Sequence, residues 1–261
     1  MCLVLVAWKA HPKYSLIVAS NRDEYHKRPS ALAHQWPSNP DITAGQDLEA
    51  LGTWMGVTRS GRWAVVTNFR EQTEAKEPKK SRGHLTTEYL SAGMTPELYV
   101  SGLKNDLAAY RGFNLLVGDR SSINYITNRQ TEKIKPEVSI NKPGIYGLSN
   151  HLLDTHWPKV VSGKKHLRGL IKKNDVIQFE DVLQFMSEKT IPSDELLPDS
   201  GVPIERERTL SPMFITTPDY GTRATSLLLV DNNSSEIQFS EATFDELGTE
   251  ISNQTYVFNL T

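Results

Sequence analysis

Runs of apolar residues predict strands at both ends of the chain. Residues 2–8 form a continuous apolar run that is typical of a buried strand. A short polar break separates this run from residues 14–20, so the two segments predict a hairpin. Ser60-Gly61 predicts the turn of a second hairpin. The remaining strands are expected at residues 53–58, 62–69, 113–119, 123–127, 145–149, 213–216, 225–230, 237–239 and 256–260.

Helical periodicity is confined to the middle of the chain. Tyr99, Leu103 and Leu107 recur every four residues, and Pro96 stands where the first turn of a helix tolerates proline. A second helix is expected after Asp154, its predicted N-cap. A third, shorter helix is expected at residues 179–189. The apolar face of the second helix would consist of Trp157, Val160, Val161, Leu167, Leu170 and Ile171.

Polar segments that contain proline, at residues 26–50, 70–82 and 190–208, predict loops. The helices therefore lie between two groups of strands, without regular βαβ alternation. This order favours an α+β fold over a doubly wound parallel sheet. Because the chain shows no internal repeat and no low-complexity linker, we expect a single domain over residues 1–261.

The amino-acid composition excludes several classes of protein. The 261 residues include 29 Lys plus Arg and 31 Asp plus Glu, a formal net charge of −2, which argues against a nucleic-acid binder. A single cysteine, Cys2, excludes an internal disulfide framework and a cysteine-based zinc cage. We expect no metal site. The longest apolar run is shorter than a membrane span and lacks signal-peptide features, so we expect a cytoplasmic protein.

Cys2 is the first candidate for chemistry. If Met1 is removed, Cys2 becomes the N-terminal residue, and its own α-amine can take the proton of the thiol. If Met1 is retained, the thiol has no such base and is a few per cent ionised at neutral pH. The alternative interpretation is a small buried side chain that opens a strand.

Polar residues at predicted strand ends form a second group of candidates. Asn21, Arg22, Asp23 and Glu24 follow a predicted buried strand, where they could hold a polarised substrate or form an ion-paired turn. Asparagines at strand ends can supply an oxyanion hole, although each of them can equally form a turn. The other candidates at such positions are Asn68, Asn150 and Arg223.

Together these segments resemble one family along nearly the whole chain. It is the family named for its Asn-Arg-Asp-Glu motif, also called the Transport and Golgi organization protein 2 family. The chain departs from the family pattern at Leu51, where glycine is usual. The matching segments are Met1-Cys2, Ala19 to Glu24, Gly52 to Gly56, Thr67 to Arg70, Ser81-Arg82-Gly83, Gly112 to Leu116, Tyr146 to Asn150, Leu153-Asp154 before Trp157, and Tyr220 to Arg223.

The resemblance implies an N-terminal-nucleophile-hydrolase-like fold, in which two antiparallel sheets lie between helical layers. In cysteine-type members of that superfamily, such as bile-salt and penicillin amidases, an N-terminal cysteine works with arginines, an aspartate and asparagines. The residues similar in type and order are Cys2, Arg22, Asp23, Asn68, Asn150 and Arg223. Arg22 and Asp23 are adjacent here, and adjacent side chains on a strand point opposite ways, so Asn21 or Glu24 could replace one of them.

The resemblance also implies three candidate functions, each with a small-molecule ligand. The first is haem trafficking without catalysis, with haem as cargo and His151 or His156 as candidate axial ligands. The second is hydrolysis of a linear C–N amide bond by Cys2, which needs no cofactor. The third is non-catalytic binding of acyl-coenzyme A or a lipid. Basic residues that could then meet phosphates are Arg70, Lys79, Lys80 and Arg82.

Overall fold

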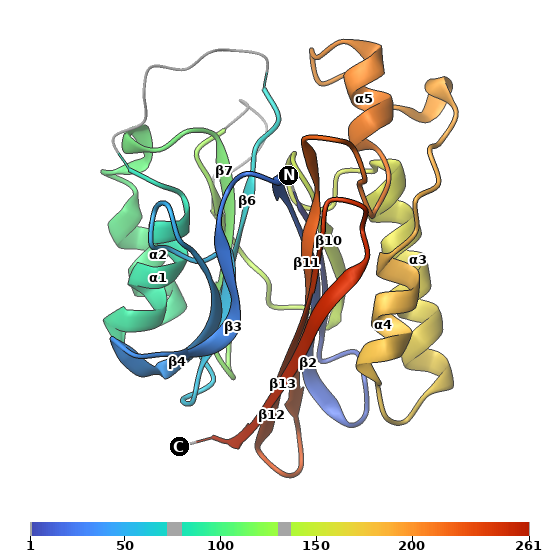
Figure 1. The fold of residues 1–261 in the computed structure, drawn as a ribbon. Coiled ribbons are helices and arrows are strands. Elements are labelled where there is room, and N and C mark those ends of the chain that lie inside the picture. The colour runs from blue at the N-terminus through green and yellow to red at the C-terminus, as the bar shows by residue number, and fades with distance from the viewer. Residues whose placement is uncertain (1, 72–79, 130–136, 261) are drawn as a thin grey trace.

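Two antiparallel sheets face each other between two pairs of helices in a computed structural model of the chain (Figure 1). The structure describes residues 2–71, 80–129 and 137–260. The first sheet has the order β10 (Gly144–Leu148), β1 (Cys2–Trp8), β2 (Tyr14–Tyr25), β11 (Tyr220–Asp231), β12 (Glu236–Phe244), β13 (Glu250–Asn259). The second has the order β3 (Ser30–Trp36), β4 (Asn39–Asp47), β5 (Met55–Thr58), β6 (Trp63–Asn68), β7 (Phe113–Gly118), β8 (Ile123–Thr127), β9 (Glu137–Ser139).

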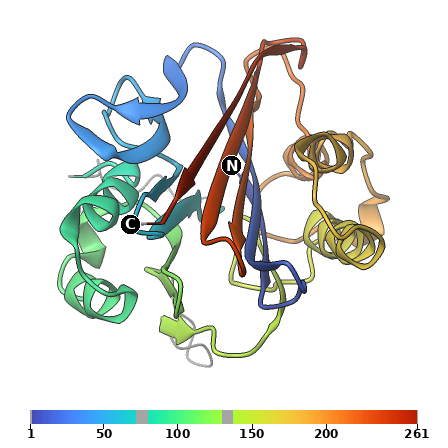
Figure 2. The same ribbon diagram turned by 90° about the horizontal axis from the view of Figure 1, so that it is seen from below.

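Helices cover the outer face of each sheet, so the layers follow the order helix, sheet, sheet, helix (Figures 1 and 2). α1 (Gly83–Ala92) and α2 (Pro96–Leu103) pack on the second sheet. α3 (Pro158–Lys173) and α4 (Phe179–Met186) pack on the first. The short α5 (Ile204–Leu210) lies beyond them, toward the end of the sandwich where β1 begins. None of these described helices is long and apolar enough to cross a membrane.

Alternation along β1 divides its side chains between two apolar cores. Val4, Val6 and Trp8 lie in the core between the two sheets. Leu3 and Leu5 lie in the core that the first sheet shares with α3 and α4. A strand covered on both faces needs apolar residues at every position, which explains the unbroken run at the start of the chain. Burial of each such side chain stabilises the fold by roughly 1.5–3 kcal/mol.

The structure confirms the α+β prediction and most of the expected strands, and it corrects four segments. Residues 26–50, expected as loop, contain β3 and β4. β3 is an edge strand with mostly half-buried side chains, so its apolar pattern is weak. α1 and α5 fall in or beside expected loops, and residues 213–216 form no strand beyond one bridge at Thr216.

Asp154 is not the N-cap of α3, contrary to the prediction. Pro158 opens that helix, and Trp157 is its N-cap. The carboxylate of Asp154 instead accepts a hydrogen bond from the backbone N–H of Gly147 at 2.7 Å and one from Lys164 Nζ at 2.7 Å. Asp154 therefore ties the turn before α3 back to β10.

Two glycines of α3 provide a matched test of this packing. A Cβ on buried Gly163 would lie 2.9 Å from Leu5 Cδ1, whereas a Cβ on Gly169 would meet nothing within 4 Å. We expect Gly163→Leu to lower the free energy of unfolding by ~1–3 kcal/mol through overpacking. Gly169→Leu should raise it by ~0.5–1 kcal/mol, because leucine is the better helix former. Urea denaturation measures both, and equal effects at the two sites would contradict this account.

Candidate functional site

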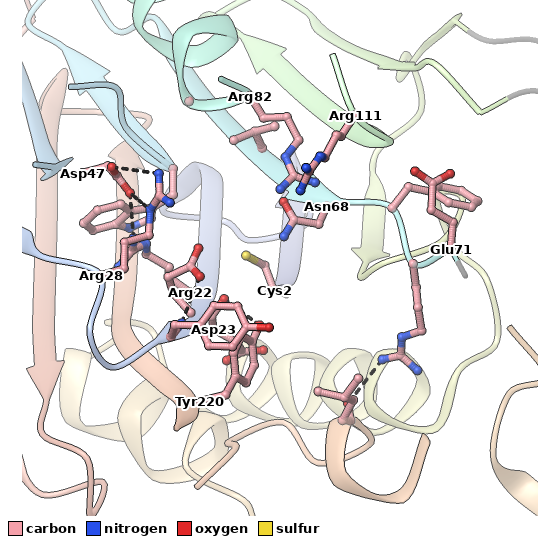
Figure 3. A pocket seen from close by; sticks show the side chains of 18 of the residues that line it. Cys2, Arg22, Asp23, Arg28, Asp47, Asn68, Glu71, Arg82, Arg111 and Tyr220 are labelled. Atoms are coloured by element: carbon pink, nitrogen blue, oxygen red, sulfur yellow. Dashed lines mark hydrogen bonds and ion pairs between the residues drawn. The ribbon is translucent and has the colours of Figure 1, made fainter. Parts of the chain in front are cut away.

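A pocket of about 1090 Å³ lies at the end of the sandwich where β1 begins. Both sheets contribute to it, together with the first residues of α1 and the segment that includes α5. Cys2 lies near the middle of the labelled side chains that surround the pocket (Figure 3). The pocket therefore collects residues that are far apart in the sequence around the only cysteine of the chain.

The Cys2 thiol is buried and electrostatically confined. Cys2 pairs with Arg22 across β1 and β2, and only 8 % of its surface is exposed. Burial raises the pKa of the thiol, although the charge of Arg22 and the backbone N–H of Asp23 act in the opposite direction. The thiol is consequently protonated at neutral pH.

Arg22 is held by an aromatic ring and a carboxylate. Its guanidinium lies 4.3 Å from the ring centroid of Trp54, and its Nη2 donates to Asp47 Oδ2 at 3.1 Å. Trp54 can lie there because Gly45 has no Cβ: a Cβ would be 2.3 Å from the ring. Nη1 of Arg22 is buried and has no hydrogen-bond partner among the described residues.

Asp23 is a buried carboxyl beside the thiol. Its Oδ1 accepts a hydrogen bond from Thr222 Oγ1 at 2.7 Å, and its backbone carbonyl accepts one from the Tyr220 hydroxyl at 2.8 Å. Burial raises the pKa of Asp23, and the nearby ammonium of Lys159 opposes that shift. Lys159, in the first turn of α3, is itself buried, and burial lowers its pKa to about 8.

The structure brings four of the seven candidate catalytic residues to the pocket. Cys2, Arg22, Asp23 and Asn68 line it. Glu24, the alternative considered for one of the adjacent pair, also lines it without replacing either. Arg22 and Asp23 both reach the pocket because β2 ends at its rim.

The other three candidates have different surroundings. Asn21 donates to the carbonyls of Met186 and Met213 at 2.9 and 2.8 Å, on the helical side of the first sheet. Asn150 Nδ2 donates to the backbone carbonyl of Asn68 at 3.0 Å, so it supports a pocket residue from behind. Arg223 Nη1 donates to the carbonyl of His26 at 2.7 Å. The roles of all seven remain predictions.

Among the described residues, arginines and carboxyl side chains both line the rest of the pocket wall. Arg70 and Arg82 were expected to meet phosphates, and both line the pocket. Lys80 is instead paired with Asp106 on the surface, and Lys79 lies outside the described residues. Three further arginines line the pocket but are not predicted from the sequence. The only local feature of each is a neighbouring polar residue or glycine, which by itself does not indicate a site. They are Arg28, Arg111 and Arg206.

A buried ion pair connects α5 to this wall. Arg70 and Glu207 form it, with 4 % and 2 % of their side chains exposed. The Arg70 guanidinium also lies 4.5 Å from the ring centroid of Trp157. Burial lowers the pKa of Arg70, and the charge of Glu207 opposes that shift. Since an unpaired buried charge is costly, this pair fixes the position of α5 over the pocket.

Neither candidate histidine lines the Cys2 pocket. The ring of His151 lies between Phe69 and Trp157, with centroid distances of 5.0 and 5.7 Å. Burial lowers the pKa of His151. His156 lines a separate hollow of about 150 Å³ beside α3. Within the described ranges, no three His, Cys, Asp or Glu side chains are grouped to hold a metal ion.

A carboxyl between the sheets supports the pocket from below. Glu241 accepts hydrogen bonds from the backbone N–H of Ala33 at 2.8 Å and from Ser226 Oγ at 2.7 Å. Burial raises its pKa to about 7, partly opposed by these hydrogen bonds and by the charge of Arg22. Glu241 thus bridges β12 and β3 directly behind Trp54.

Fold and site together define an N-terminal-nucleophile-hydrolase-like sandwich with a cysteine in its pocket, as the resemblance implied. Two solved structures share this architecture. The first is a mutant of the conjugated bile acid hydrolase from Clostridium perfringens, with a TM-score of 0.50 and 12 % identity over 100 % of this chain and 98 % of that one. The second is the Caenorhabditis elegans ortholog of N-acylethanolamine-hydrolyzing acid amidase, with a TM-score of 0.50 and 9 % identity over 87 % and 92 %.

The chain belongs to the Transport and Golgi organisation 2 family, whose family model matches residues 1–246. The human Transport and Golgi organization protein 2 homolog is 30 % identical over 100 % of this chain and 99 % of its own length. The Drosophila melanogaster Transport and Golgi organization protein 2 is 26 % identical over 95 % and 93 %. These matches confirm the family expected from the sequence.

The buried Glu241 carboxyl predicts a dependence of stability on pH. Its pKa is raised in the folded chain, so it stabilises the fold fully below its unfolded pKa and loses this contribution as pH rises through about 7. From pH 5 to pH 8, wild type should lose ~2 kcal/mol of stability relative to Glu241→Gln, whose amide has no proton to lose. Urea denaturation at both pH values measures the difference, and a difference that is the same at both would refute the assignment.

Proposed function

We propose that this protein carries haem in the Cys2 pocket. The observation that supports the proposal is a buried thiol and several arginines on the wall of one cavity of about 1090 Å³. Haem combines an iron that accepts a cysteine sulfur with two carboxylates that pair with guanidinium groups. Its iron and its acidic edge therefore match the two kinds of group that this pocket offers.

The apolar part of the wall suits a flat, largely apolar macrocycle. Trp54, Val66, Phe69 and Leu210 line the pocket together with the charged side chains. The cavity volume is at the upper end of the roughly 300–1,000 Å³ that is usual for small-molecule sites. Because no histidine of the described ranges lines the cavity, Cys2 rather than His151 or His156 would hold the iron.

The protonated Cys2 thiol can serve as an iron ligand without a base of its own. A thiolate is the nucleophilic form of cysteine, and burial raises the pKa of this thiol. Coordination to a metal removes the thiol proton, so the same group becomes a ligand when iron binds. Protons then compete with iron for the sulfur, and haem affinity rises with pH.

Titration of the purified protein with haem tests the proposal. Wild type should develop a saturable Soret shift, bind more tightly at pH 8 than at pH 6, and transfer haem to an apo-acceptor protein. Cys2→Ala should weaken binding at least tenfold, change the Soret position and remove the pH dependence, since the iron ligand is lost. His156→Ala is the matched control and should behave as wild type. Transfer no greater than that from an unrelated acidic protein would end this proposal.

Amide hydrolysis by Cys2 is the second candidate function. It is favoured by the position of the thiol between Arg22, Asp23 and Asn68. The two solved structures of similar fold are described as a conjugated bile acid hydrolase and an N-acylethanolamine-hydrolyzing acid amidase. In this mechanism the α-amine of Cys2 takes the thiol proton, the thiolate attacks the amide carbonyl, and Asn68 is the candidate donor to the oxyanion.

Intact-mass measurement separates catalysis from carriage. The hydrolase requires removal of Met1, because the α-amine of Cys2 exists only in the shortened chain. A processed chain should be labelled by a thiol-directed amide probe, and Cys2→Ala should abolish the labelling. A mature chain that retains Met1 excludes this mechanism and leaves haem carriage unaffected. Acyl-coenzyme A is the third candidate, and displacement of haem by it would show that the two share the pocket.

A further inference from the structure

Arg82 and Arg111 bring two positive charges together on one side of the pocket. Arg82 is the N-cap residue of α1, and Arg111 precedes β7. Both line the pocket, and their guanidinium groups lie next to each other on the side of Asn68 (Figure 3). Burial lowers the pKa of Arg82; the charge of Glu24 opposes this shift, and the charge of Arg111 adds to it. Two cations so arranged repel each other, so this arrangement is not explained by stability.

No carboxylate within the described ranges forms an ion pair with either arginine. The side chain of Arg82 donates to the carbonyl of Gly112 at 3.1 Å, and the charges of Glu24 and Glu71 act on it without a direct ion pair. Glu71, which also lines the pocket, accepts hydrogen bonds from Arg129 at 2.5 and 2.8 Å. Glu71 is therefore already bound to another guanidinium.

The start of α1 adds to the positive field. Ser81, Arg82 and Gly83 all line the pocket, and the first turn of this ten-residue helix contains no acidic residue. Helix N-termini carry a partial positive charge and free N–H groups. The guanidinium pair and the helix terminus thus favour a negative group at the same place.

We propose that Arg82 and Arg111 form an oxyanion subsite that binds a carboxylate or phosphate group of the ligand. The inference rests on the proposed function and adds an orientation to it: the acidic end of the ligand lies against α1, and its reactive or metal centre lies toward Cys2. Guanidinium forks bind such groups through two parallel N–H···O bonds, which fixes direction as well as charge. A ligand without an oxyanion would lack this anchor.

Haem and haem dimethyl ester form the pair of probes that tests the subsite, because the ester lacks both carboxylates. Arg82→Gln and Arg111→Gln should each weaken haem binding about tenfold and leave binding of the ester unchanged. Arg120→Gln is the control: it removes an exposed arginine that does not line the pocket, and it should bind both probes as wild type does. Because Arg111 is exposed and only its backbone carbonyl accepts a hydrogen bond, from Asn128, its variant keeps the test valid if Arg82→Gln fails to fold.

The outcomes separate the subsite from the proposed function. Equal haem affinity in wild type and both variants overturns the subsite while haem carriage stands. Equal loss of affinity for haem and for the ester overturns it too, because the two arginines would then have only a structural role.

If wild type binds no haem, haem carriage fails, and palmitoyl-coenzyme A becomes the probe. A loss of about tenfold for that probe in the same variants identifies a phosphate subsite. Unchanged binding of palmitoyl-coenzyme A, or no binding of either probe, overturns the inference.

Discussion

The antiparallel register of β1 and β2 is the constraint on which the site depends. It places Cys2 opposite Arg22 and Leu3 opposite Asn21. Side chains alternate along both strands, so the first pair faces the second sheet and the second pair faces the helices. A slip of one residue would exchange the two faces. The thiol would then lie among α3 and α4, and the asparagine that holds the helical layer would face the pocket.

Arg82 and Arg111 belong to the connections of the second sheet, whereas the thiol and Arg22 come from the first. Arg82 stands at the start of α1, and Arg111 precedes β7. Arg22 crosses between the sheets by stacking on Trp54, which in turn lies over Gly45 and near Glu241. The distance between the two sheets and the position of the Arg22 charge in the pocket therefore depend on the same contacts. Titration of Glu241 acts on the interface that also positions Arg22.

Local hydrophobic patterns predict a strand correctly only where the strand is buried along its whole length. β1, β7 and β8 are buried along their lengths and were predicted with small errors at their ends, whereas the half-exposed β3 was missed. The site residues, too, are predictable only where local sequence determines their positions. Cys2, Arg22 and Asp23 belong to neighbouring strands joined by a short turn, so sequence proximity indicates their proximity in space. Arg111 and Arg206 reach the pocket only because distant elements pack together, and the spacing of residues along the sequence does not predict that packing.

The electrostatics of the pocket set the resting state of the thiol. A cysteine nucleophile needs a depressed pKa or a general base; burial and the nearby Asp23 carboxyl both raise the pKa of Cys2, so catalysis would require the α-amine as that base. Arg22, which would stabilise a thiolate, is engaged by Asp47 and Trp54. Arg82 and Arg111 place their charge where an external anion can reach it. Under the proposed function, a neutral thiol in the same pocket as two adjacent guanidinium groups suits a ligand that supplies its own negative charge, and the thiol would lose its proton only to a metal or a base.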